Sequence, residues 1–167
     1  MTTDLRFEFV VDRNERTLTV IREFAASRQL VWDCHTKSDL LDRWFAPKPL
    51  TTKTRHMDFR PGGYWHYAMI MPDGEQFWSR LDYESVDPID GYTALDGFTD
   101  EEGGINPEMP RSRWIVRFAD QQHHTLVTTV VRYASAEDLQ KVIDMGIEGG
   151  MTSTLERLDE LLQSLSA

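Results

Sequence analysis

The chain has 167 residues, of which 40% are hydrophobic and 28% charged, and its 28 acidic and 18 basic residues give a formal net charge of −10. This length and composition are typical of one soluble globular domain and argue against a disordered chain. The negative charge disfavours nucleic acid or an anionic membrane as a partner, because like charges repel. The single cysteine, Cys34, excludes an internal disulfide, and we expect a cytoplasmic protein without membrane insertion.

The first part of the sequence predicts two strands followed by two short helices. Apolar residues alternate with mostly polar ones over residues 5–11 and 18–24, as expected for strands with one buried face. Ser27 and Ser38 are each suited to cap a helix, because a serine side chain can accept a hydrogen bond from a free backbone N–H group of the first turn. Pro47 would end the second helix.

The middle of the chain, from Thr52 to Arg132, predicts a meander of antiparallel strands. Turn signals at Pro61-Gly62-Gly63 and Pro72-Asp73-Gly74 flank a strand over residues 64–71. The acidic segment 99–110, with its prolines and glycines, predicts a long exposed loop. The other predicted strands cover residues 77–86, 92–98, 113–119 and 125–133.

The last part of the sequence predicts a long helix that begins at Ser135. From Leu139 to Leu162 apolar residues recur at steps of three and four, the spacing of one buried helical face. Gly146, Gly149 and Gly150 interrupt this pattern and indicate either a close approach to a neighbour or a kink.

Strands enclosed between helices predict an α+β fold, in which a curved antiparallel sheet wraps around the C-terminal helix and the two short helices follow the first strands. Three segments, in this order, carry a resemblance to a known family: Trp44-Phe45-Ala46-Pro47, then residues 58–67 (DFRPGGYWHY), then residues 155–162 (LERLDELL). They resemble the activator of heat-shock protein 90 ATPase homologue (AHSA-type) group of the START-like (SRPBCC) superfamily.

This resemblance runs from Thr17 to Leu162 and implies the helix-grip, Bet v-like fold. The chain is then a single START-like domain over residues 1–167, in which residues 1–16 add an N-terminal strand to a family-like core over residues 17–162.

Five tryptophans and seven methionines suggest a partly filled interior, and we expect a hydrophobic cavity between the C-terminal helix and the sheet. Trp65, Tyr67 and Met69 share one side of their strand and are predicted to face the helix. The candidate cavity residues are Trp44, Phe45, Trp65, Tyr67, Met69, Phe77, Leu81, Tyr83, Trp114, Val116, Met145 and Met151. The candidate polar residues are His66, Arg80 and Tyr133.

No cofactor or metal ion is expected. The histidines lack the spacing of a metal site, and no pattern of a calcium loop or a catalytic serine is present. The acids Asp96, Asp100, Glu101 and Glu102 are expected to form a solvated rim near the long loop.

Three functions follow from the pattern and the resemblance. The leading prediction is binding of a small hydrophobic, aromatic or lipid-like ligand in the cavity. The first alternative is an enzyme that resembles polyketide cyclases or aromatases, with Tyr83 or His66 moving a proton. The second is a co-chaperone-type ATPase activator. Pairing of edge strands in a homodimer also stays open.

Overall fold

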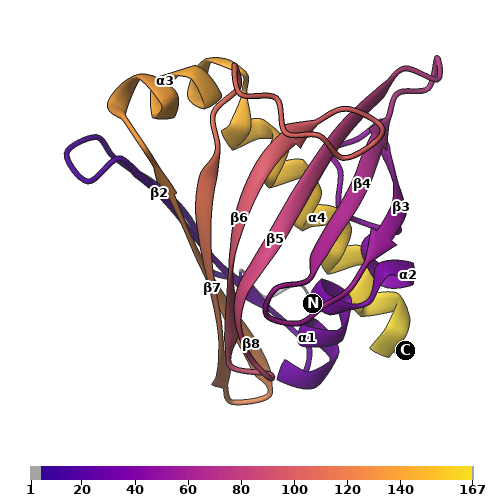
Figure 1. Cartoon of the computed structure of the whole chain (residues 1–167). Helices are drawn as coiled ribbons and strands as arrows, with labels where there is room; N and C mark the ends of the chain where they lie inside the picture. Colours follow the sequence, from indigo (N-terminus) through magenta and orange to yellow (C-terminus); the bar gives the residue numbers. More distant parts are fainter. Residues whose placement is uncertain (1–4, 167) are drawn as a thin grey trace.

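The computed structural model describes residues 5–166, which form one eight-stranded antiparallel sheet and four helices (Figure 1). The strand order in the sheet is β1-β2-β8-β7-β6-β5-β4-β3. The elements are, in chain order, β1 (Phe7–Asp12), β2 (Thr17–Phe24), α1 (Arg28–Thr36), α2 (Ser38–Leu41), β3 (Thr51–Met57), β4 (Tyr64–Ile70), β5 (Gln76–Asp87), β6 (Gly91–Thr99), β7 (Ser112–Gln121), β8 (His124–Tyr133), α3 (Ala136–Asp144) and α4 (Ile147–Ser166).

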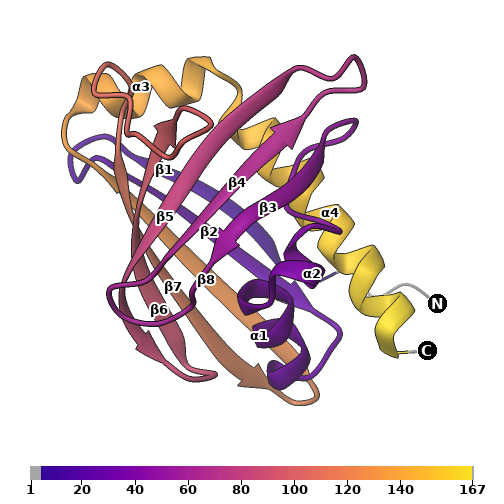
Figure 2. The ribbon, with the colours of Figure 1, turned by 45° about the vertical axis from the view of Figure 1, so that its right-hand side comes forward.

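The sheet curves around α4, which crosses its concave face (Figures 1 and 2). Helices α1 and α2 lie beside the C-terminal half of α4, and α3 lies at the opposite end. This arrangement is the helix-grip fold, and it confirms the predicted α+β architecture. The first four residues of the predicted segment 1–16 lie outside the described residues. No helix within residues 5–166 is long and apolar enough to cross a membrane.

The two short helices differ in how well their starts were predicted. Ser27 caps α1 and accepts a hydrogen bond from the backbone N–H of Leu30 at 3.2 Å, as predicted. The prediction for Ser38 was wrong, because Lys37 precedes α2 without a side-chain cap and Ser38 is the first helical residue. Helix α2 also ends at Leu41, well before Pro47.

The predicted C-terminal helix is two helices. Ser135 caps α3 through the backbone N–H of Asp138 at 3.1 Å, as predicted. Gly146 then adopts a φ of +88°, in the left-handed region, and ends this helix before α4 begins at Ile147. At Gly146 the chain therefore bends, as in the second of the two expectations for these glycines. At Gly149 no neighbour approaches closely, because a Cβ built there would meet no other atom within 4 Å.

A side-chain contact fixes α4 along its axis. Arg157 donates hydrogen bonds to the carbonyl oxygens of Ala46 and Leu50, both at 2.7 Å. These carbonyls belong to the segment between α2 and β3. Near the same turn of α4, Asp159 lies 3.9 Å from the guanidinium of Arg22 on β2. The first contact ties the helix to the segment before β3, and the second ties it to β2.

Candidate functional site

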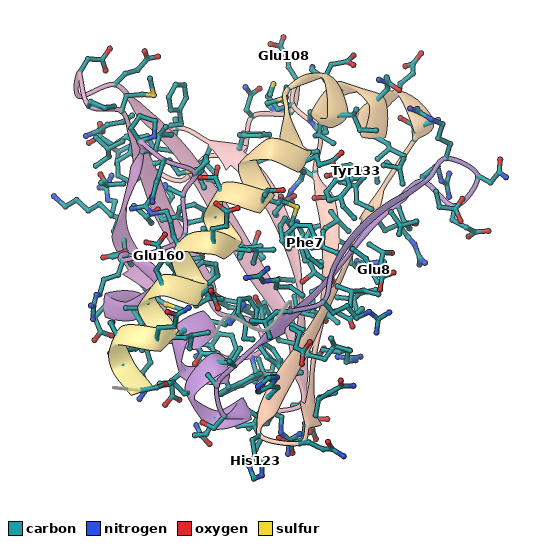
Figure 3. All side chains as sticks on the ribbon, turned by 180° about the vertical axis from the view of Figure 1, so that it is seen from behind. Phe7, Glu8, Glu108, His123, Tyr133 and Glu160 are labelled. Carbon is teal, nitrogen blue, oxygen red and sulfur yellow. The ribbon has the colours of Figure 1, made fainter. Side chains whose placement is uncertain are left out.

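The register of the strands separates the side chains of the concave face from those of the convex face. Directly paired residues on neighbouring strands point to the same side of a sheet. One such row crosses five strands on the concave face and contains Trp65, Leu81, Asp96, Ser112 and Tyr133. The view from behind shows α4 in front of this face, with Tyr133 just below α3 (Figure 3).

Aromatic rings fill the half of the concave face that lies next to α1. The rings of Trp65 and Tyr67 stack with centroids 3.9 Å apart, and Phe45 packs edge-on against Trp65 at 5.0 Å. Leu158 and Leu162 of α4 are fully buried against the same cluster. We call this half the packed end. The predicted residues that it contains are Trp44, Phe45, Trp65, Tyr67, Leu81, Tyr83 and Val116.

The other half of the concave face, below α3 and the first turns of α4, is covered less completely. No residue of α4 from Ile147 to Arg157 is buried, in contrast to Leu158. On the sheet, Phe77 is 46% exposed and Phe98 is half-buried, although both are on strand positions that face α4. We call this half the open end. Its other half-buried apolar side chain is Met151, and at its border with the packed end lie Met69, Trp114 and Leu155, which are half-buried and pack against the aromatic cluster.

An acidic group lies between the two ends. The Oδ1 atom of Asp96 accepts hydrogen bonds from the backbone N–H of Ser112 at 2.8 Å and from its hydroxyl at 2.6 Å. The indole N–H of Trp114 donates to the same hydroxyl at 3.1 Å. Burial raises the pKa of Asp96, whereas these donors favour its ionised form. The prediction of a solvated rim was therefore wrong for Asp96.

Two phenol groups, those of Tyr67 and Tyr133, lie near this carboxylate. Burial raises the pKa of Tyr67 and of Tyr133, and the charge of Asp96 raises both further. Burial likewise raises the pKa of Tyr83 and of Tyr92. At neutral pH these hydroxyls therefore carry their protons and can donate hydrogen bonds. Phenol donors and one carboxylate are thus set into a mainly apolar surface.

His66, predicted to lie in the cavity, lies on the convex face. Its position on β4 alternates with Trp65 and Tyr67, so its side chain points away from α4. The imidazole is 3% exposed, and its Nε2 atom lies 3.2 Å from the carbonyl oxygen of Asp100 and from the hydroxyl of Thr99. Burial lowers the pKa of His66. The cavity prediction was therefore wrong for this residue.

Arg80 also lies on the convex face, because it is paired with His66 across β4 and β5. Its guanidinium lies 4.4 Å from the centre of the Tyr64 ring and 2.8 Å from the carboxylate of Asp82. Met145 follows α3 as its C-cap residue and is 55% exposed, so it does not line a closed cavity. The predictions for Arg80 and Met145 as cavity residues were wrong for these reasons.

The long loop after β6 crosses the convex face over β5 and β4 (Figure 1). Arg55 donates a hydrogen bond to the carbonyl oxygen of Glu101, and Asp100 accepts one from Gly104 at 2.9 Å. A pocket of about 220 Å³ lies beside the loop, between Arg55, Trp78 and Glu101. Within residues 5–166 no group of three or more histidine, cysteine or acidic residues is arranged to hold a metal ion.

Sequence reasoning missed the polar part of the site. Asp96 and Phe98 have the same strand parity as Tyr92 and Ala94, which are buried on the concave face. This alternation was visible in the sequence, but the neighbouring acids of the loop suggested a solvent-exposed position for Asp96. Nothing in the sequence around Ser112 marked it as a site residue. Its role depends on its pairing with Asp96 across β6 and β7, which only the structure shows.

Known structures with the same fold were found in several bacteria. Protein Ms6760 from Mycobacterium smegmatis is 33% identical, with a TM-score of 0.87 over 95% of this chain and 97% of the other. A protein from Arthrobacter aurescens is 26% identical, with a TM-score of 0.89 over 94% and 91% of the two chains. A protein from Staphylococcus epidermidis is 28% identical, with a TM-score of 0.82 over 92% and 93%.

No curated protein matches the sequence. The model of one protein family matches residues 25–163, which include α1 to β8, α3 and most of α4. The matched segment thus contains both the packed end and the open end, together with Asp96. The chain therefore belongs to the family of activator of Hsp90 ATPase homolog 1-like proteins.

Proposed function

We propose that this protein binds a small hydrophobic, aromatic or lipid-like molecule between α4 and the sheet, at the open end. The observation that carries this proposal is the change in burial along α4. Leu158 and Leu162 are fully buried, whereas Met151 and Leu155, on the same apolar stripe, keep part of their surface in contact with solvent.

The sheet opposite these residues shows the same change. Phe77, Phe98 and Trp114 are large and apolar and face α4, and none of them is buried. A ligand that covers such surface gains about 25 cal/mol for each Å² of apolar area removed from water. Ligand sites are typically apolar with a few polar groups, as this end of the concave face is.

The described geometry supports binding ahead of proton transfer. His66, which the enzyme alternative would use, is on the convex face. Tyr83, the other candidate, is a buried phenol with a raised pKa, so it is a poor base at neutral pH. Neither residue is placed at the open end.

An NMR titration of the ¹⁵N-labelled protein with 2-naphthol tests the proposal. We expect saturable shifts of the Phe98 and Leu155 amides and of the Trp114 indole N–H. Met69→Trp should weaken binding at least about tenfold, because the larger ring occupies the open end from β4. Ile70→Trp is the matched control, since the neighbouring position points to the convex face, and it should leave the affinity unchanged.

Two results would contradict binding at the open end. One is a titration without saturable shifts on the concave face. The other is a set of shifts centred on Trp78 and Arg55, which would place the probe in the convex pocket. In that second case Ile70→Trp, and not Met69→Trp, would weaken binding.

A further inference from the structure

We infer that Asp96 is the polar anchor of this site and that it selects aromatic ligands bearing a hydroxyl group over unsubstituted or carboxylate-bearing ones. The inference rests on the proposed function, because it assigns the ligand class of the same concave site. It is carried by the position of Asp96, its hydrogen bonds and the groups around it.

Asp96 is a carboxylate in apolar surroundings. Its direct partner on β5 is Leu81, and its neighbours of the same parity on β6 are Ala94 and Phe98. A carboxylate at such a place costs free energy unless hydrogen bonds or a cation compensate the lost water. Ser112 supplies part of this compensation and is itself only 3% exposed.

One oxygen of the carboxylate keeps its acceptor capacity. Both hydrogen bonds from Ser112 end on Oδ1. The indole N–H of Trp114, which donates to the Ser112 hydroxyl, also favours the ionised form of Asp96. Within residues 5–166, the buried side-chain nitrogen and oxygen atoms that lack a hydrogen-bond partner are Arg22 Nε and Arg28 Nε. Oδ2 is not one of these atoms, so it is not a buried acceptor left without a partner, and as a carboxylate oxygen it has lone pairs for a further hydrogen bond.

No ion pair of this carboxylate is present within residues 5–166, although the charge of Arg111 favours its ionised form. Arg111 approaches Asp96, but its Nε atom donates to the backbone carbonyl oxygen at 2.9 Å. Its terminal nitrogen is paired with Asp82 at 2.9 Å, on the convex side. A donor from a ligand would therefore add a hydrogen bond to Oδ2 in a space from which the ligand excludes water.

The neighbouring phenols narrow the ligand class. Tyr67 and Tyr133 carry their protons and lie near enough for the charge of Asp96 to raise the pKa of each. Each phenol also has a serine within hydrogen-bond reach, Ser79 for Tyr67 and Ser112 for Tyr133. A phenol hydroxyl can still donate to a ligand, whereas Asp96 accepts from it. A ligand hydroxyl can do both at once, since it donates one hydrogen bond and accepts others. A ligand carboxylate would instead lie beside a like charge.

The test compares three probes that share one aromatic ring system and differ in one substituent: naphthalene, 2-naphthol and 2-naphthoate. Their dissociation constants are measured at pH 7.5 by NMR titration. We expect 2-naphthol to bind about tenfold or more tightly than naphthalene, as is typical for one hydrogen bond to a charged acceptor. We expect 2-naphthoate to bind more weakly than either. Asp96→Leu should remove the preference for 2-naphthol.

Asp96→Asn is a second variant of nearly the same shape, and it keeps the inference testable where the leucine variant does not fold. It should bring the affinity for 2-naphthoate closer to that for 2-naphthol, because the like charge is gone. Asp82→Asn is the matched control, since it removes the same charge from the convex face. It should leave the order of the three probes unchanged.

The two possible failures are distinguishable. Equal binding of naphthalene and 2-naphthol, or an unchanged preference in both Asp96 variants, would overturn the role of Asp96 while binding at the open end stands. Failure of all three probes to bind would overturn the proposed function and the anchor together, because then the aromatic body itself is not recognised.

Discussion

The two ends of α4 face the same sheet but differ in what their apolar side chains contact. At the packed end, Leu158 and Leu162 meet the aromatic cluster around Trp65 and are removed from water. At the open end, Met151 and Leu155 continue the same stripe and stay half-buried. An amphipathic helix can therefore provide stability with one half and a binding surface with the other, without a change in its hydrophobic pattern.

Shortening a leucine at each end gives the largest expected effect. Leu158→Ala should lower the free energy of unfolding by about 2–5 kcal/mol, because it leaves a cavity in a close-packed cluster. Leu155→Ala should cost only about 1 kcal/mol, since its surroundings are already partly solvated. Urea denaturation of both variants measures the difference. Equal losses would show that the two ends are packed alike.

A buried histidine at the packed end predicts a pH dependence. The imidazole of His35 lies between the rings of Trp44 and Phe118, each at 5.0 Å, and its Nδ1 lies 2.8 Å from the carbonyl oxygen of Val31. Burial lowers the pKa of His35 from 6.5 to about 4. Between these values the unfolded chain binds more protons than the folded protein, so stability falls as the pH falls.

The stability that depends on a neutral His35 is fully present above pH 6.5. About 3 kcal/mol of the free energy of unfolding is lost by pH 4. His35→Leu should remove this pH-dependent contribution. The stability of the variant should therefore depend less steeply on pH between pH 4 and pH 6.5. Urea denaturation at several pH values gives both slopes. Carboxylates titrate in both proteins, so the difference between the slopes is the readout. Parallel curves would contradict a neutral, buried His35.

The smallest expected effect is at the open end. Gly149 lies in the first turns of α4, and a Cβ there would meet no other atom within 4 Å. Gly149→Ala should therefore stabilise the protein by about 0.5–1 kcal/mol, through the better helix propensity of alanine. Thermal unfolding measures this gain. A lower melting temperature would show that a neighbour does approach Gly149 closely.

Much of the fold could be predicted from the sequence, because its signals are local. The alternation over Tyr64 to Ile70 placed Trp65, Tyr67 and Met69 on the concave face, and the structure has them there. The spacing from Leu139 onward predicted a long buried stripe. It could not show that Gly146 takes a left-handed conformation and divides the helix, since periodicity continues across the break.

The candidate site was less predictable, because its polar groups are defined by pairs across strands. Trp78 and Phe77 are neighbours in sequence, yet only the register assigns Phe77 to the concave face. The strand parity of His66 already excluded it from the face of Trp65, and only its chemistry suggested the cavity. Asp96 became a candidate through Ser112, which is 16 residues away in the sequence.

The two hydrogen bonds from Arg157 to the carbonyl oxygens of Ala46 and Leu50 restrict how this fold can adapt to ligands of different size. They oppose movement of the helix along its axis, because a large axial shift would break both bonds. The space available to a ligand is then set by the size of the side chains at a few positions, such as Met69, Met151 and Leu155. Relatives that retain this arginine clamp should therefore differ in ligand size through substitutions at those positions, with the backbone unchanged.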